Sequence, residues 1–457
     1  MDDLLRDVAA RASRYLEQLP ERPVAATPEA VAALKRLGGP LPETGNDPAA
    51  IVSLLDEVGA PATVASAGPR YFGFVTGGAL PTSLAANWLA SAWDQNSFSS
   101  IGSPVGAAID AIALEWLRDI FGLPVGCGGA LVTGATMANF TGLAAARHRV
   151  LTDAGWDLAE DGLTGAPPVT IVVGGEAHAT LFKALRLLGF GRRNLVRVPV
   201  DAQGRMMADA LPTLSGPAIV CLQAGNVNTG AFDPAGPVIE QAHAARAWVH
   251  VDGAFGLWAA AAPERAHLMA GYDGADSWAV DGHKWLNVPY DCGIALVRRP
   301  ADLSAAMAVQ AAYLPMETQR QPIHFTPESS RRMRGLEVWA ALKSLGRAGV
   351  AEMIERNCRQ AARLAEGLSA AGFEILNEVV LNQVLVSFGP ADVTQRVIAA
   401  VQTEGTCWCG GTVWQDKTAM RISVSNWATT DADIERSLEA IGRVAIAEIK
   451  AAAQKAS

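Results

Sequence analysis

Short apolar runs alternate with stretches of helical spacing between residues 168 and 300, and this pattern constrains the fold most strongly. It predicts an α/β fold, in which helices cover both faces of a sheet. Ligands of such sheets bind at the carboxyl ends of the strands. The expected strands are Val169–Val173, Leu195–Val200, Ala218–Leu222, Ala247–Val251, Ser277–Val280 and Gly293–Arg298.

The segments on either side of this region have different patterns. A chain of 457 residues exceeds what one core usually holds. Residues 1–62 are expected to form a helical extension with proline-rich joints and no core of its own. Residues 313–457 combine long helices with short strands, which predicts a small α+β domain preceded by a loop. We therefore expect the extension, a large α/β domain over residues 63–312, and the small domain.

Composition narrows the possible partners and compartments. The chain has 46 acidic and 37 basic residues, a net charge of −9, and no Lys/Arg-rich tract, so no nucleic-acid partner is expected. No stretch reaches the roughly 18 apolar residues of a membrane span, and the first 21 residues lack the features of a secretory signal. Six scattered cysteines fit a reducing cytoplasm. Cys407 and Cys409 have no second pair nearby, so no metal site is expected.

Lys284 directly follows one of the expected strands. Ser277–Asp281 has the pattern of a short buried strand, and Gly282 ends it. A neutral lysine amine condenses with a carbonyl to form a Schiff base. Lysines beside buried strands more often pack their stems on apolar neighbours and reach the surface. The lysine alone therefore does not decide between these interpretations.

Polar residues also stand at the ends of other expected strands. Asp252 ends an apolar strand, where a carboxylate needs a cation, although it would also suit a helix cap. His178 follows the strand that ends at Val173, and an isolated histidine is more often a surface or capping residue. Residues 128–147 pass from a strand through small residues into a helix, whose start suits a phosphate with the help of the Thr136 hydroxyl.

The sequence motifs around these residues resemble those of a known family. Asp-Gly-His-Lys-Trp, followed by Asn-Val-Pro-Tyr-Asp-Cys-Gly, is similar to the Schiff-base segment of the group II pyridoxal-5′-phosphate (PLP) amino acid decarboxylases, the family of the glutamate and aromatic amino acid enzymes. His-Val-Asp-Gly-Ala at 250–254 resembles a second motif of that family. Gly134, Ala135 and Thr136 align with its phosphate cup. The resemblance runs from about residue 65 to 430.

The resemblance implies a fold, a cofactor and a set of cofactor contacts. The fold would be a PLP-dependent transferase-like (fold type I) large domain with a mixed sheet, in a homodimer. Lys284 would bear the cofactor, and Asp252 would keep its ring nitrogen protonated so that the ring accepts electrons. His178 would stack on the ring. The cofactor contacts implied in this way are Ala135, Thr136, His178, Asp252, Ala254, His283 and Lys284.

Two further segments concern the substrate. The aromatic, glycine-rich loop at 68–78 is similar to a family loop that lines the substrate pocket, although aromatics on such loops equally serve packing. It supplies Tyr71, Phe72 and Phe74 as candidates, with Phe98 beyond it, and we select Phe74. Arg421 aligns with a family arginine near the substrate carboxylate or the lid, with a structural ion pair as the alternative.

The unpatterned stretch from Gln310 to Ser330 corresponds to the mobile catalytic loop of the family, which commonly donates a tyrosine as proton donor. Here Tyr313 stands near the start of the loop, and Pro322 occupies the usual tyrosine position. His324 is therefore the expected proton donor, with a solvent-facing loop histidine as the alternative. Asn226 and Asn228 stand where the family usually has threonines near the cofactor.

The expected function is decarboxylation of an L-amino acid to an amine and carbon dioxide by a PLP-dependent carboxy-lyase. An aldehyde-forming or C–C lyase activity on the same fold is an alternative, which the missing loop tyrosine keeps open. A catalytically silent scaffold is a second alternative, against which the complete set of lysine, aspartate and histidine argues. The sequence does not identify the side chain of the substrate.

Overall fold

The structure is a computed structural model that describes residues 2–308 and 320–456. The chain divides into two compact units. The small unit comprises Met1–Gly78, Ala362–Leu376 and Val384–Ser457, and the large unit comprises Ala79–Ala361 and Asn377–Gln383. The boundaries expected along the chain, after residues 62 and 312, stay a prediction.

A seven-stranded mixed sheet forms the centre of the large unit, with the strand order β1-β7-β6-β5-β4-β2-β3. β7 runs antiparallel to both of its neighbours, whereas β6, β5, β4, β2 and β3 pair in parallel. This sheet confirms the predicted α/β class. The strands are β1 (Gly128–Val132), β2 (Thr170–Gly174), β3 (Leu195–Val198), β4 (Ala218–Gln223), β5 (Trp248–Asp252), β6 (Ser277–Asp281) and β7 (Gly293–Val297).

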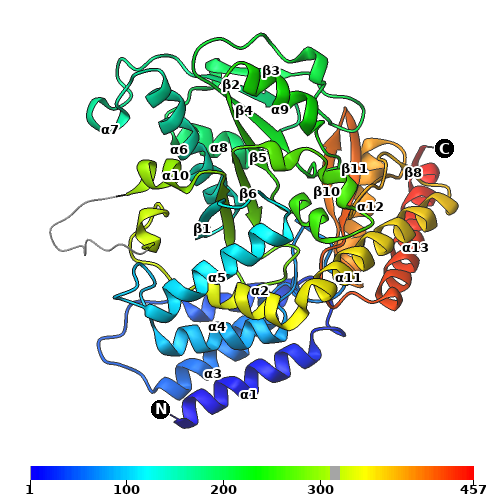
Figure 1. Ribbon diagram of the computed structural model, residues 1–457. Coiled ribbons are helices and arrows are strands. Elements are labelled where there is room, and N and C mark those ends of the chain that lie inside the picture. Colours follow the sequence, from blue (N-terminus) through cyan, green and yellow to red (C-terminus); the bar gives the residue numbers. More distant parts are fainter. Residues whose placement is uncertain (1, 309–319, 457) are drawn as a thin grey trace. The chain divides into compact units, whose positions relative to one another are not determined.

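Helices cover both faces of this sheet. α8 (Ala179–Leu187) connects β2 to β3, and α9 (Ala235–Ala244) connects β4 to β5 in the opposite direction along the strand order. Because such crossovers are right-handed, α8 and α9 lie on opposite faces (Figure 1). α6 (Ala135–Asp153) lies on the same face as α8 and packs along β7, β6 and β5.

The strand directions position the functional site. β1 and β6 both run antiparallel to β7, so β1, β2, β5 and β6 point the same way. Their carboxyl ends therefore meet at one edge of the sheet. Gly134, His178, Asp252 and Lys284 all stand at or just after these ends.

The remaining helices of the large unit begin with conventional signals. Ser103 caps α5 by accepting a hydrogen bond from Gly106, and Pro104 follows at the first helical position. α11 continues into the small unit. It is interrupted at Gly346, whose φ of 60° is not helical, and the sequence predicted two separate helices on either side of this residue. These helices are α4 (Pro81–Trp93), α5 (Pro104–Ile120), α7 (Leu158–Asp161), α10 (Pro300–Met307) and α11 (Gly335–Ala370).

The small unit contains a four-stranded sheet in the order β10-β11-β9-β8. The sequence predicted β9 and β11 but not β8, which has two residues, nor β10, which begins with two glycines. The elements of this unit are α1 (Asp2–Gln18), α2 (Pro28–Ala33), α3 (Pro48–Gly59), β8 (Glu374–Ile375), β9 (Gln383–Ser387), α12 (Ala391–Glu404), β10 (Gly410–Trp414), β11 (Lys417–Ser423) and α13 (Asp431–Ala456).

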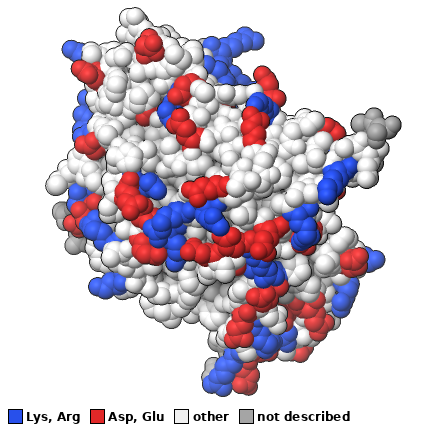
Figure 2. All heavy atoms as spheres, turned by 90° about the vertical axis from the view of Figure 1, so that its right-hand side faces the viewer, with Lys and Arg blue, Asp and Glu red and all other residues white. Residues whose placement is uncertain are grey.

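Acidic and basic side chains are intermixed on the face drawn in Figure 2. In the small unit, Arg396 pairs with Asp392 at 2.7 Å and Arg443 pairs with Glu404 at 2.6 Å. Among the described helices, none is long and apolar enough to cross a membrane.

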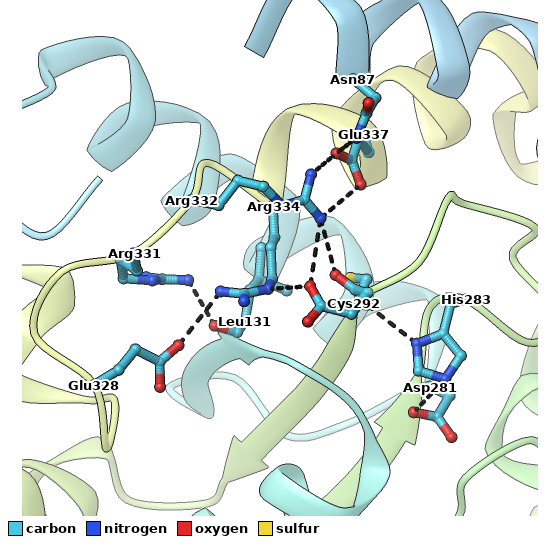
Figure 3. A network of polar contacts seen from close by, with 11 residues as sticks. Asn87, Leu131, Asp281, His283, Cys292, Glu328, Arg331, Arg332, Arg334 and Glu337 are labelled. Atoms are coloured by element: carbon cyan, nitrogen blue, oxygen red, sulfur yellow. Dashed lines mark hydrogen bonds and ion pairs between the residues drawn. The ribbon is translucent and has the colours of Figure 1, made fainter. Parts of the chain in front are cut away.

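A buried ion pair joins the segment that follows residue 320 to the sheet. Arg331 Nη1 lies 2.9 Å from Asp110 Oδ2, and the two side chains are only 1% and 2% exposed. Arg331 Nη2 also donates a hydrogen bond to the carbonyl of Leu131 in β1 at 2.6 Å (Figure 3). Removing one partner of such a pair leaves an uncompensated buried charge.

We therefore expect Arg331→Met to lower the free energy of unfolding by about 3–5 kcal/mol. The control is Arg347→Met, because Arg347 and Asp119 form an ion pair whose side chains are 62% and 58% exposed. Loss of this exposed ion pair should lower the free energy of unfolding by less than about 1 kcal/mol. Urea unfolding of the apoproteins at one protein concentration measures both changes, and equal losses would contradict the account.

Candidate active site

Lys284 contacts a carboxylate that belongs to the strand before it. Lys284 Nζ lies 2.9 Å from Oδ2 of Asp281, the last residue of β6. Oδ1 of the same buried carboxylate accepts a hydrogen bond of 2.5 Å from the N–H of Ala135, at the start of α6. Asp281 thus joins the lysine to the proposed phosphate cup. The sequence interpretation missed Asp281, although it ends the strand three residues before the lysine.

His283 is held on both sides of its ring. Its Nε2 lies 3.3 Å from Asp281 Oδ1, and its Nδ1 accepts a hydrogen bond of 3.1 Å from the N–H of Cys292 (Figure 3). Burial lowers the pKa of His283, while Asp281 acts in the opposite direction. Since Nδ1 accepts, the neutral ring carries its hydrogen on Nε2, which faces Asp281. A Cβ at Gly134 would lie 3.0 Å from the ring, so this glycine lets His283 approach.

The loop that holds His283 is fixed by arginines from another segment. Arg334 Nε donates to Asp291 Oδ1 at 3.0 Å, and Arg332 donates to the Asp291 carbonyl at 3.0 Å while pairing with Glu337 (Figure 3). Asp291 directly precedes Cys292. The sequence interpretation did not assign these arginines, because their partners lie about 40 residues away in the chain.

The start of α6 offers donors for an anion. Gly134 and Ala135 follow β1, and helix geometry leaves the N–H groups of Thr136 and Met137 outside the hydrogen bonds of the helix itself. Thr136 is half-buried and adds its hydroxyl. The N–H of Ala135 already donates to Asp281, so a phosphate would depend on the donors that follow it.

Asp252 is a buried carboxylate at the end of β5. Its Oδ2 accepts a hydrogen bond of 3.2 Å from Asn139 Nδ2, and its Oδ1 accepts one of 3.3 Å from the N–H of Ala254. Burial raises the pKa of Asp252, and its electrostatic interactions with His178 and Lys284 act in the opposite direction. The carboxylate therefore lies in the electrostatic field of both residues.

His178 caps α8. Its Nδ1 lies 2.6 Å from Thr180 Oγ1 and accepts a weaker hydrogen bond of 3.4 Å from the N–H of Thr180. This cap, the structural role weighed in the sequence interpretation, holds the ring at the carboxyl edge of the sheet.

Two further buried residues support Asp252. His250 precedes it by two positions, on the same face of β5, with Nε2 2.8 Å from Asn139 Oδ1 and Nδ1 2.8 Å from Ser277 Oγ. Asn139 lies one helical turn after Ala135. The sequence interpretation assigned neither residue, although the two-residue period of the strand places His250 on the face of Asp252.

These residues fit pyridoxal 5′-phosphate. They place an amine, a buried carboxylate and a helix start at one sheet edge, with the small residues Gly134, Gly253 and Ala254 among them. Burial disfavours the ionised form of Asp252, so a protonated ring nitrogen would supply the cation that this carboxylate needs. Lys284 would bind the aldehyde and Thr136 the phosphate.

Known proteins share both the sequence pattern and the fold. Residues 35–389 match the family model described as "Pyridoxal-dependent decarboxylase conserved domain". An aromatic-L-amino-acid decarboxylase of Bacillus atrophaeus is 25% identical over 91% of this chain and 89% of its own length. An L-2,4-diaminobutyrate decarboxylase of Rhizobium meliloti (strain 1021) is 28% identical over 89% and 84%. The crystal structure of Oryza sativa TDC with PLP and tryptamine superimposes with a TM-score of 0.89 and 22% identity, over 97% of each chain.

The chain thus belongs to the pyridoxal-dependent decarboxylase family. It is a carboxy-lyase that uses pyridoxal 5′-phosphate to decarboxylate an amino acid.

The expected substrate residues Phe74 and Arg421 belong to the small unit. Phe72 donates its N–H to the Trp408 carbonyl at 2.8 Å and accepts a hydrogen bond of 3.0 Å from Ser423 N–H. The aromatic loop is thereby attached beside β11, two residues from Arg421. Phe74 is 66% exposed and its ring centroid lies 5.2 Å from that of Trp408. Burial lowers the pKa of Arg421. Substrate binding by both residues stays a prediction.

His324 is the expected proton donor, and Tyr313 stands near the start of the same loop. Tyr313 lies outside the described residues. His324 ends a short 3-10 helix, Pro322–His324, in which the N–H of Ile323 donates to the Phe98 carbonyl at 2.9 Å. The His324 side chain is half-buried, and its buried Nδ1 has no hydrogen-bond partner among the described residues. Its role as proton donor stays a prediction.

The buried imidazole of His250 predicts a pH dependence of stability. Burial lowers the pKa of His250 to about 3 in the folded chain, whereas an unfolded histidine has a pKa of about 6.5. Between these values the unfolded chain binds the extra proton, so stability falls as the pH falls through this window. From pH 7 to pH 5 this group should remove about 2 kcal/mol from the wild-type protein.

His250→Gln should lack this loss, as urea unfolding of both proteins at the two pH values would measure. Burial raises the pKa of Asp233 to about 6, which acts in the opposite direction over part of the same window. Because Asp233 is present in both proteins, the difference between them isolates His250. Equal pH dependence in both proteins would show that His250 is not buried neutral.

Proposed function

We propose that Lys284 binds the cofactor aldehyde, that Asp252 holds the ring nitrogen protonated, and that the substrate is an aromatic L-amino acid. When bound in this way, pyridoxal 5′-phosphate supplies a ring that accepts electrons from the α-carbon of the substrate. The observation that carries the proposal is the buried Asp252 carboxylate, which interacts electrostatically with His178 and Lys284 at the same sheet edge.

The other residues of the edge have supporting roles in this proposal. Asp281 holds the Lys284 amine at 2.9 Å and so orients it whenever the amine is released from the cofactor. His178, fixed by its cap on α8, stacks on the ring. His283 stays beside Asp281 through the N–H of Cys292. Ala135 and Thr136 receive the phosphate, and Ala254 leaves room for a flat ring.

The aromatic substrate is supported by a cluster of rings in the small unit. Tyr71 stacks on Trp408 with ring centroids 5.1 Å apart, and Phe74 lies on the same indole. Aromatic side chains favour such stacked and tilted partners. We assign the substrate side chain to Phe74, its carboxylate to Arg421, and proton return to His324. The two curated relatives described above differ in their substrates, so the aromatic cluster and not the family carries this assignment.

Incubation with each of the twenty amino acids tests this proposal. We expect one amine and one carbon dioxide per substrate consumed, with aromatic amino acids the most rapidly used. Lys284→Ala should lose the visible absorption band of the lysine-bound cofactor and nearly all turnover, because no other amine replaces it. The exposed Lys343 gives the control variant Lys343→Ala, which should retain both.

Other outcomes separate the alternatives. Aldehyde, ammonia and peroxide in place of the amine would indicate an aldehyde-forming enzyme. Turnover of acidic or diamino substrates alone would overturn the aromatic assignment and leave decarboxylation in place. Absence of both the absorption band and turnover would indicate a silent scaffold.

We also propose that the enzyme is a cytoplasmic homodimer whose contact includes the N-terminal helices of the small unit. Exposed apolar clusters mark protein contacts, and these helices expose several apolar side chains: Leu5, Val8, Leu16, Ile51 and Leu55. The cytoplasmic location is supported by the six cysteines, which are all free thiols.

Light scattering coupled to gel filtration should therefore give twice the mass of one chain. The double variant Leu5→Glu/Leu16→Glu should shift the protein toward the monomer, because it adds charge to an apolar contact. Val125→Glu, at an apolar residue of the large unit that is 91% exposed, is the matched control and should stay dimeric. A monomeric wild-type protein at micromolar concentration would refute the dimer.

A further inference from the structure

A continuous row of hydrogen bonds leads from the core of the sheet to Asp252. Trp248 Nε1 donates to Ser277 Oγ at 2.9 Å, and Ser277 Oγ lies 2.8 Å from His250 Nδ1. His250 Nε2 lies 2.8 Å from Asn139 Oδ1, and Asn139 Nδ2 donates to Asp252 Oδ2 at 3.2 Å. All five side chains are buried. The row therefore joins β5, β6 and α6 at a carboxylate that the cofactor needs.

The chemistry of its two ends fixes every hydrogen in this row. An indole N–H can only donate, and an ionised carboxylate can only accept. Asn139 therefore turns its NH₂ toward Asp252 and its oxygen toward His250, so His250 Nε2 must carry a hydrogen. The other nitrogen of a neutral imidazole then accepts, and the Ser277 hydroxyl donates to it while accepting from Trp248. With an ionised Asp252 and a neutral His250, one arrangement satisfies all four contacts.

The neighbouring helix is shaped to admit the imidazole. A Cβ at Gly142 of α6 would lie 3.0 Å from His250 Cε1 and 3.3 Å from Ser277 Cβ, closer than ordinary contact. Asn139 lies three residues earlier on the same helix, so one face of α6 both receives His250 and presents the amide to Asp252. Burial, which lowers the pKa of His250 to about 3, keeps the ring neutral, so one of its nitrogens donates and the other accepts.

We propose that His250 and Asn139 are positioning residues that fix the orientation of Asp252 and keep its carboxylate ionised for the ring nitrogen of the cofactor. If Asn139 turned over, its oxygen would face Asp252, and only a protonated acid would tolerate that contact. A protonated Asp252 could not stabilise a cationic ring nitrogen. This inference rests on the proposed role of Asp252, and the arrangement of hydrogens follows from the four contacts when that carboxylate is ionised.

Charged and titratable groups from several elements surround the Asp252 end of the row. Glu176 after β2 and Asp233 after β4 line a small cavity together with Asp252. His178 at the start of α8 and Lys284 after β6 interact electrostatically with Asp252 and favour its ionised form. Cys221 of β4 also interacts with Asp252, and burial raises the pKa of its thiol, so it stays neutral. The side chains in contact with His250, those of Asn139 and Ser277, are uncharged. A change of the Asp252 environment in variants of His250 or Asn139 therefore reports on the row itself.

The first experiment reads the tautomer in the wild-type holoenzyme. Nitrogen NMR of protein labelled with ¹⁵N-histidine distinguishes a protonated from an unprotonated ring nitrogen, and the spectrum of His250→Gln identifies the His250 signals. We expect a neutral ring with its hydrogen on Nε2 from about pH 6 to about pH 8. A hydrogen on Nδ1 alone would overturn the proposal, because Nε2 would then accept from Asn139 and the Asn139 oxygen would face Asp252. Hydrogens on both nitrogens would also overturn it, because the ring would then not be held neutral in one tautomer.

The second experiment measures cofactor binding and its pH dependence in variants. His250→Leu and Asn139→Leu should each raise the dissociation constant of pyridoxal 5′-phosphate about tenfold or more, since a hydrogen bond to a charged group is lost. Both should also shift the pH midpoint of the visible band of the bound cofactor. His250→Gln, which retains an N–H donor for Asn139, should recover part of both properties.

His243→Leu is the control, because His243 pairs with Asp276 at 3.0 Å and its side chain is 41% exposed. It should bind the cofactor as the wild-type protein does. If the leucine variants lower only the unfolding midpoint and keep the wild-type affinity and pH midpoint, the row serves packing alone and the proposal is wrong. If either variant fails to fold, the tautomer of His250 measured in the first experiment still tests the proposal. Wild-type cofactor affinity in Asp252→Asn would instead refute the proposed function itself, whatever the tautomer of His250.

Discussion

The arrangement of the candidate site depends on one buried carboxylate, that of Asp252. Asp252 ends a strand that is buried along its whole length, where an ionised acid is costly unless a cation and hydrogen-bond donors compensate it. Asn139 and Ala254 supply the donors, and electrostatic interactions with His178 and Lys284 favour the ionised form. A protonated pyridine nitrogen would supply the cation that this carboxylate needs, so the feature that opposes folding would favour binding of the cofactor.

The architecture explains why these groups meet. Four strands that run in the same direction end at one edge, and each delivers one part of the site from a different stretch of chain. α6 joins three of these parts, since its first N–H binds Asp281, its second turn supplies Asn139, and Gly142 admits His250. Arg332 and Arg334 then hold the loop behind His283 through Asp291. The side chains of this site are therefore positioned mainly by the ends of helices and strands.

Much of this could be predicted from local sequence. A strand gives a periodic apolar signal, and the polar residues at its carboxyl end lie at the edge where ligands bind, which is why Lys284, Asp252 and His178 were selected as candidates. The sequence predicted β1 to β7 but missed β8 and β10, whose short or glycine-rich segments carry little signal. Asp281, Asn139 and His250 were missed as site residues, because the hydrogen bonds that join them to Ala135, Asp252 and to each other span 111 to 146 residues of the chain, although Asp281 also lies only three residues before Lys284. Distant pairing depends on the assembled sheet and leaves no local pattern.

The most direct measurement of the central claim is a crystal structure of the enzyme with pyridoxal 5′-phosphate bound. The account predicts a covalent bond from the cofactor to Lys284 Nζ and a pyridine nitrogen within about 3 Å of the Asp252 carboxylate, as a charge-assisted hydrogen bond requires. A ring nitrogen that faces solvent, or a carboxylate that is turned away to bind another cation, would contradict it.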